Sequence, residues 1–168
     1  MTHTSHPRNP PDSVAGSGSP EALGIDAQLV SDAQLRARLS FLLTAAIQRQ
    51  VWLFFLDSEY RLIEPIMPMN DHPNDPHELH DTDDLGRLTF PQVFFARAQQ
   101  IAAWVGAASF VIVWERPGRA QPTEDDVRWA QAFMRCAAEA GAGDGASLRR
   151  LMLLHDKGLR VLDQKDLH

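Results

Sequence analysis

The chain has 168 residues, of which 44% are hydrophobic, enough for one domain with a substantial core. Its formal net charge of −6 argues against a nucleic-acid partner, because phosphate binding needs a concentrated basic face. The single cysteine, Cys136, excludes an intrachain disulfide framework and fits a reducing compartment. No cleavable leader opens the chain and no apolar run approaches the roughly 20 residues that cross a bilayer, so we expect a cytoplasmic protein without a membrane segment.

The N-terminal residues differ in composition from the rest. Residues 1–22 are rich in Ser, Pro and Gly and carry almost nothing to bury, which predicts a disordered tail. Residues 23–168 are expected to form a single α/β domain. Within residues 26–49, apolar side chains recur every three or four positions, which predicts an amphipathic helix; they are Leu35, Leu39, Leu42, Ala46 and Ile47.

Two strands are predicted next. Residues 51–56, VWLFFL, are apolar throughout, as in a strand covered on both faces. The polar residues 57–60 turn the chain, and residues 61–66 return as a second strand. Pro65 cannot donate to a ladder, so this second strand should lie at an edge of the sheet. Residues 68–88 follow, with three histidines and many acidic residues, and we expect a long, flexible surface loop.

The second half of the chain alternates helices and strands. A capped helix is predicted from residue 89 to Val105, followed by a strand over 108–114. Residues 123–126, Thr-Glu-Asp-Asp, match a capping box that begins a helix running to about residue 140. Residues 148–154 and 159–162 should pair as a final hairpin. The order helix, hairpin, helix, strand, helix, hairpin predicts an α/β (α+β) fold with a mixed sheet of about five strands flanked by helices.

Several stretches together resemble a known family: LFFLDSEYRLI, PQVFFARAQQIAAWVGAASFVIVW, PTEDD and LMLLHDKGLRVL. They are similar to the JAB/MPN superfamily of metal-dependent hydrolases, nearest its bacterial RadC-like branch, and the similarity covers roughly residues 50–163. The resemblance implies the JAB/MPN, cytidine-deaminase-like arrangement, with elements in the order α-ββ-α-β-α-ββ.

The resemblance also indicates where a metal site would lie. In the family a His-x-His pair and an Asp hold zinc, with a Ser three residues before the Asp. Here the His positions fall on Trp114 and Arg116, the Ser on Thr123 and the Asp on Asp126. A catalytic zinc usually needs three protein ligands, and one carboxylate is too few. We therefore expect these four positions to be vestigial and the chain to be a pseudoenzyme that binds an unidentified protein, peptide or small ligand, with no cofactor.

Each of these positions also has a plainer explanation. Thr123 and Asp126 are fully explained as a helix cap. Arg116 is hypothesised to pair with Asp126 or Glu115, an ion pair that replaces the metal. Glu64 is a weak candidate for the family's general base, but an edge-strand Glu beside a proline is more typical of a solvated side chain.

An alternative reading keeps a metal-dependent hydrolase or peptidase, with zinc ligands relocated to the loop at residues 68–88. The candidates are His72, His77, His80 and Asp81. This reading predicts that the loop folds back over the cleft near Asp126 and Glu64. A solvated acidic loop explains the same residues without metal.

Three tryptophans, Trp104, Trp114 and Trp129, are expected in the core; an exposed Trp114 would favour a ligand site.

Overall fold

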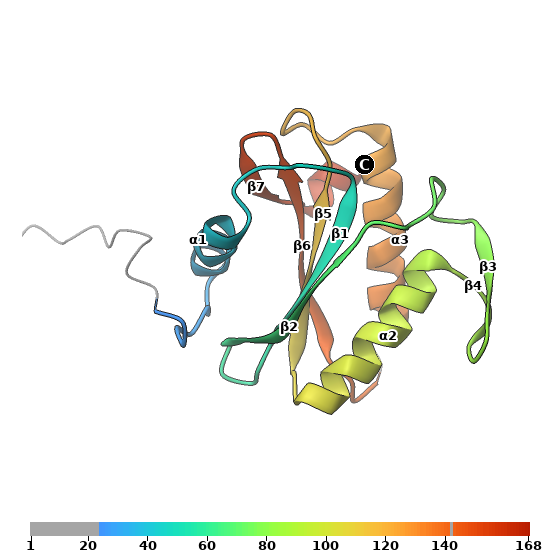
Figure 1. Cartoon of the computed structure of the whole chain (residues 1–168), viewed down its shortest axis with the longest axis horizontal. Coiled ribbons are helices and arrows are strands. Elements are labelled where there is room, and N and C mark those ends of the chain that lie inside the picture. Colours follow the sequence, from blue (N-terminus) through green and yellow to red (C-terminus); the bar gives the residue numbers. More distant parts are fainter. Residues whose placement is uncertain (1–23, 142) are drawn as a thin grey trace, which may run out of the picture.

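A five-stranded mixed sheet organises the part of the chain that the computed structural model describes, residues 24–141 and 143–168 (Figure 1). The predicted tail at residues 1–22 lies outside the described residues. Strands follow one another across the sheet in the order β2-β1-β5-β6-β7; β5 and β6 are parallel, and every other neighbouring pair is antiparallel. The expected mixed sheet of about five strands flanked by helices is confirmed.

The elements along the chain are α1 (Asp32–Leu42), β1 (Gln50–Leu56), β2 (Leu62–Met69), β3 (Leu79–Thr82), β4 (Gly86–Thr89), α2 (Phe90–Val105), β5 (Ser109–Glu115), α3 (Glu124–Ala140), β6 (Ser147–His155), β7 (Gly158–Val161) and the short 3-10 helix η2 (Gln164–Leu167). The small β3–β4 hairpin forms a separate two-stranded sheet. None of the helices in the described part of the chain is long and apolar enough to cross a membrane.

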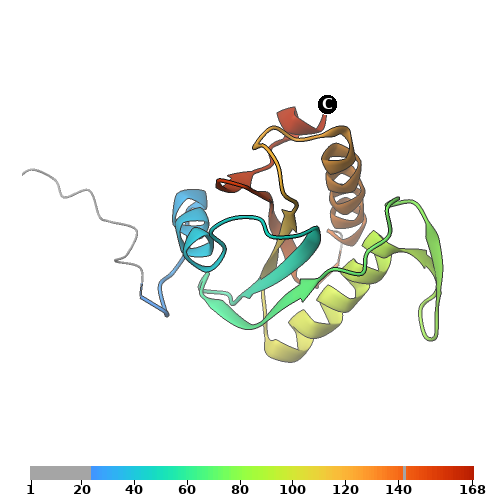
Figure 2. The same cartoon turned by 45° about the horizontal axis from the view of Figure 1, so that its top comes forward.

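Helices cover both faces of the sheet. Figures 1 and 2 show α1 on one side and α2 with α3 on the other. Phe55, Phe110 and Phe133 belong to the core beneath α2 and α3, whereas Leu39 and Met152 belong to the core beneath α1. All seven residues of β5 are buried, because this central strand has neighbours on both edges and helices on both faces.

The first helix is shorter than predicted. The expectation of one helix over residues 26–49 is wrong, because α1 ends at Leu42 and Leu43 is extended, with φ −124° and ψ 95°. Beyond it, the Ile47 and Gln48 amides donate to the Glu115 carboxylate instead of continuing the helical ladder. The Ile47 side chain is 85% exposed. A long-range bond to a buried acid has therefore overridden the local helical pattern.

The prediction of a flexible loop over residues 68–88 is also wrong in part. Strand β2 continues to Met69, and the β3–β4 hairpin occupies the end of the segment. The Thr82 hydroxyl accepts from the Leu85 amide and donates to the Gly86 carbonyl, which closes the turn. Arg97 of α2 makes two hydrogen bonds to Asp84, so the hairpin is tied to a helix.

The edge position predicted for β2 is confirmed, since β1 is its only neighbour in the described sheet.

Two of the three tryptophans are buried as expected, Trp114 and Trp129. Trp104 is not: its side chain is 88% exposed. The buried face of α2 includes Ala98 and Ala102, and a residue two positions after Ala102 lies on the opposite side of a helix with 3.6 residues per turn.

Leu39 and Phe41 of α1 offer a matched test of how this helix packs. Leu39 is fully buried in the core, whereas the Phe41 side chain is 71% exposed. Leu39→Ala should lower the free energy of unfolding by about 2–5 kcal/mol, through lost burial and a residual cavity. Phe41→Ala should change it by about 0.5 kcal/mol or less. Urea denaturation followed by circular dichroism measures both, and equal losses would contradict the packing of α1 described here.

Candidate functional site

The candidate site is the corner, residues 114–126, where β5 ends and α3 begins. Ligand sites in open α/β sheets lie outside the carboxyl ends of the strands, which is where this segment is found. At its end the Thr123 hydroxyl accepts from the Asp126 amide at 3.2 Å, and the Asp126 carboxylate accepts from the Thr123 amide at 2.8 Å. The predicted capping box is therefore present.

The Asp126 carboxylate is surrounded by donors and is only 2% exposed. Its Oδ1 accepts from Trp114 Nε1 at 2.8 Å. Its Oδ2 accepts from Arg116 Nε at 2.9 Å and Nη2 at 2.7 Å, besides the Thr123 amide. Burial alone raises the pKa of Asp126, but the bonds from Arg116, Thr123 and Trp114 outweigh it and bring the pKa below its usual value. The group is a buried, fully bonded anion.

Arg116 closes the corner as well as neutralising Asp126. The hypothesised ion pair is present, with Nη2 2.7 Å from the carboxylate. The same guanidinium donates to the carbonyls of Arg119, at 2.6 Å, and Gln121, at 3.0 Å. Gly118 lies beneath it with φ +120°, and a Cβ there would meet Arg116 Nη1 at 3.4 Å. Arg116 thus ties the turn between β5 and α3 to the Asp126 carboxylate, while Asp156 bonds the turn at Gly118 and Arg160 bonds it at Ala120.

Glu115 is a second buried carboxylate, 1% exposed, and the hypothesis that it pairs with Arg116 is not borne out. Its four hydrogen bonds come from the Ile47 amide (2.6 Å), the Gln48 amide (3.2 Å), Gln50 Nε2 (2.6 Å) and Trp52 Nε1 (2.6 Å). Glu115 therefore anchors the segment between α1 and β1. The sequence offered one signal for this role, an acidic residue directly after a fully apolar strand.

An aromatic cluster fills the space beside the corner. Trp114 stacks on Trp129 with ring centroids 4.9 Å apart, and His72 packs edge-on against both rings at 4.9 and 5.3 Å. The Arg49 guanidinium lies over Trp114 at 5.1 Å. Trp114 is 2% exposed, so the condition that would have favoured a ligand site here, an exposed Trp114, is not met.

His72 is the residue whose environment the sequence did not reveal. It was expected in a solvated loop, yet it is buried, and neither ring nitrogen has a hydrogen-bond partner within the described residues. Burial, and after it the nearby Arg49 charge, lowers the pKa of His72 to about 4. His72 is therefore a neutral imidazole packed as an aromatic ring.

The residues proposed as relocated zinc ligands are not brought together. His72 lies in the aromatic cluster, whereas His77 and Asp81 are exposed, and His80 lies on β3 with its Nε2 3.9 Å from Glu78. Within residues 24–141 and 143–168, no group of three or more His, Cys, Asp or Glu side chains is placed to hold a metal ion. Only the start of the loop folds back against the corner, through His72.

Glu64 lies away from the corner. It is exposed on β2, after Ile63, which pairs with Phe55 of β1. The corner is reached at the other end of these strands, where Val51 pairs with both Trp114 and Met69. The structure therefore does not place a carboxylate from β2 beside Asp126.

Cys136 and His155, two residues of chemically reactive types, are both buried and have structural roles. Cys136 is buried in α3, and burial, with the neighbouring Glu139, raises the pKa of its thiol to about 11, so it is protonated at neutral pH. His155 is buried at the β6–β7 turn, where its Nδ1 accepts from the Lys157 amide at 3.2 Å. Burial, followed by the charge of Arg116, lowers the pKa of His155. Among the residues that the structure describes, neither Cys136 nor His155 has the hydrogen-bond partners of a catalytic nucleophile or base.

Comparison with known proteins does not assign the chain to a family. No protein-family model matches the chain, and no curated protein matches it. A function therefore has to be inferred from the chemistry of the corner and from the resemblance in the sequence.

Arg116→Ala should be strongly destabilising, because it leaves the buried Asp126 carboxylate without its cation. We expect a loss of about 3 kcal/mol in the free energy of unfolding at pH 7. Arg128→Ala, which removes the exposed ion pair to Asp125, should cost about 0.5 kcal/mol or less. Urea denaturation measures both, and a similar small loss for the two variants would rule out a structural role for the Arg116–Asp126 pair.

The Arg116→Ala effect should also depend on pH. With its pKa depressed in the folded state, Asp126 contributes stability above its ordinary pKa of 3.8, and this stability is lost as the pH falls through the folded value. In Arg116→Ala the buried carboxylate has lost its cation, so burial makes it take up a proton at a higher pH than in the wild type, and the difference in stability between the two proteins should narrow as the pH falls from 7 to about 3.5. A difference that stays constant over this range would contradict the pairing.

His72→Phe should make the free energy of unfolding depend less on pH between pH 7 and about pH 4.5. The folded protein keeps His72 neutral down to about pH 4, whereas the unfolded chain takes up a proton below 6.5, so stability falls as the pH drops between these values. The wild type should lose about 2 kcal/mol between pH 7 and pH 4.5 through this residue, and His72→Phe should not. His77→Phe, at an exposed position, is the control and should follow the wild-type profile.

Proposed function

We propose that the chain is a non-catalytic JAB/MPN-like domain of the bacterial RadC-like branch that acts in the cytoplasm as a protein- or ligand-binding module. The observation that carries this proposal is the bonding of Asp126. In the family its counterpart is a zinc ligand; here its oxygens accept from Trp114, Arg116 and Thr123. A positive side chain stands where the metal would be, so the position has exchanged a metal for an ion pair.

The arrangement of elements supports the same proposal. A helix, a hairpin, and then alternating helices and strands lead to a final hairpin, with β3 and β4 added between β2 and α2. This is the order that the resemblance implies. The contacts among the four proposed vestigial positions support the proposal: Trp114 lies near the end of β5, Arg116 directly follows that strand, and Thr123 and Asp126 lie at the start of α3. The buried, protonated Cys136 is consistent with a cytoplasmic location.

The alternative, a hydrolase with relocated zinc ligands, has less support. Its only candidate near the corner is His72, whose pKa is lowered by burial and by the Arg49 charge beside it. A nearby guanidinium opposes a second cation, and three ligands are normally required. His72 also lies edge-on between two indole rings, an arrangement that apolar packing explains.

Restoring the two histidines tests the proposed ancestry of the corner. The double variant Trp114→His/Arg116→His would place two imidazoles beside Asp126, the three ligands of a zinc site with an open position. We expect the double variant to bind about one zinc ion per chain and to gain thermal stability as zinc is added. Wild-type protein should do neither. Metal analysis and thermal unfolding, with and without zinc, give the two readouts.

Two controls make the result interpretable. Adding Asp126→Asn to the double variant should abolish zinc binding, since an amide is a poor zinc ligand. Arg116→His alone keeps the Trp114 indole and should bind zinc weakly, still dependent on Asp126. A folded double variant that binds no more zinc than its Asp126→Asn derivative would reject the proposed relationship. Stoichiometric zinc in the wild type, lost when His72, His77 and His80 are all changed to Ala, would favour the hydrolase.

A further inference from the structure

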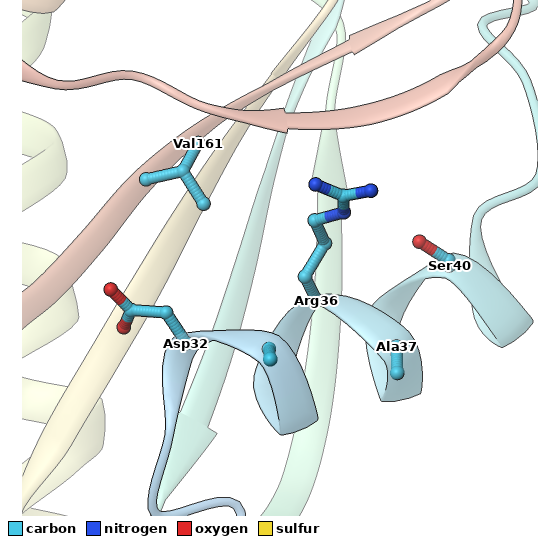
Figure 3. A pocket seen from close by; sticks show the side chains of 6 residues that line it. Asp32, Arg36, Ala37, Ser40 and Val161 are labelled. Atoms are coloured by element: carbon cyan, nitrogen blue, oxygen red, sulfur yellow. The ribbon is translucent and has the colours of Figure 1, made fainter. Parts of the chain in front are cut away.

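A groove lies between α1 and β7, away from the corner's aromatic cluster. It has a volume of about 590 Å³ and is lined by Asp32, Ala33, Arg36, Ala37 and Ser40 of α1 and by Val161 of β7. This volume is within the range of ligand-binding clefts. Figure 3 shows the Arg36 side chain extending from α1 toward β7, with the Val161 side chain pointing down from the strand.

One wall of this groove is a sheet edge whose backbone is available for pairing. β7 is the last strand of the described sheet. The Leu162 amide donates to the Leu151 carbonyl at 3.0 Å, and the next pair along is Met152 with Val161. Because bonded and non-bonded pairs alternate in an antiparallel ladder, the N–H and C=O groups of Val161 and Leu159 point away from β6. They can therefore accept a further strand.

The opposite edge of the sheet is protected differently. β2 carries Pro65 and Pro68, and prolines at an edge block the addition of another strand because they lack an N–H. The sequence of β7, Gly-Leu-Arg-Val, contains no proline. Of the two edge strands, β7 is therefore the one to which a short extended segment could add.

Charge identifies the kind of segment. Asp32, one turn before Arg36, is paired with Arg150 at 2.9 Å rather than with Arg36. Across residues 24–141 and 143–168, Arg36 has no hydrogen bond or ion pair. Its exposed guanidinium thus reaches into the groove without an ion pair among the described residues, beside the small side chains of Ala33 and Ala37, which leave room for another backbone. A planar carboxylate is the natural partner of such a group.

We infer that the groove between α1 and β7 binds an extended peptide segment of another protein, which adds as a strand to the edge of β7 and places an Asp or Glu side chain on Arg36. Strand addition of this kind draws affinity from main-chain hydrogen bonds and specificity from side-chain contacts. The inference rests on the proposed role as a binding module and supplies its partner class. It does not depend on the vestigial metal positions.

The test uses a phage-displayed library of random octapeptides with Glu fixed at the centre, selected on the full-length protein. Selected peptides are resynthesised with acetylated and amidated ends, which removes terminal charges, and binding is measured by fluorescence polarisation. Replacing the central Glu by Gln should weaken binding about tenfold, and Arg36→Glu in the protein should weaken it at least as much. Arg87→Glu, the same charge change on β4 across the molecule from α1 (Figures 1 and 2), should leave binding unchanged.

The strand-addition step has its own readout. Hydrogen exchange of the Leu159 and Val161 amides should slow at least tenfold when peptide is bound. Val161→Pro removes the outward N–H and should weaken binding about tenfold, whereas Val161→Ala keeps the N–H and should stay within about threefold of wild type. The inference is overturned if selection yields nothing enriched over the Arg36→Glu protein, or if the peptides leave these two amides unprotected. If Trp114→His/Arg116→His binds zinc but either of these peptide experiments fails, the peptide groove is rejected and the proposed origin of the corner stands.

Discussion

The neutralisation of Asp126 is the constraint on which the rest of this structure depends. A carboxylate that is almost fully removed from water must be matched by donors, and an unmatched one would cost several kcal/mol. Arg116 and Trp114, at the end of the central strand, donate hydrogen bonds to this carboxylate. The same bonds join β5 to the first turn of α3. One set of contacts therefore both neutralises the buried carboxylate and fixes the start of α3 on the central strand.

The alternation of side chains at the end of β5 extends this constraint to the other face of the sheet. Trp114 and Arg116 point toward Asp126, and Glu115, between them, points the opposite way, as successive residues of a strand must. There its carboxylate holds the Ile47 and Gln48 amides and the Trp52 indole. Three consecutive residues thus fix both the start of α3 and the approach from α1 to β1. Substitutions at Trp114 or Arg116 should therefore disturb the start of α3, and substitutions at Glu115 the segment between α1 and β1.

Much of the fold could be predicted from the sequence, because local patterns and tertiary contacts agree there. The apolar run of β1, Pro65 at an edge and the Thr123 cap each describe the folded protein correctly. Predictions failed where a distant partner decided the outcome. The helical pattern beyond Leu43 gave way to bonds with Glu115, and His72 left its polar loop for two indole rings. Neither partner is close in sequence, so the patterns around residues 43–49 and around His72 did not indicate them.

The corner and the groove present opposite chemical situations. At the corner the buried charges have partners: Arg116 donates to Asp126 and to two carbonyls, Glu115 accepts four hydrogen bonds, and the Arg49 guanidinium lies over Trp114. The buried polar groups of the corner thus make their hydrogen bonds within the described residues. At the groove, Arg36 is uncompensated within the described residues, and the edge of β7 has donors and acceptors facing outward. These groups can exchange water for the carboxylate and main-chain groups of a partner, and the strand to which the partner adds is already ordered by folding. Binding is therefore expected at the open edge of this sheet rather than at the corner between β5 and α3.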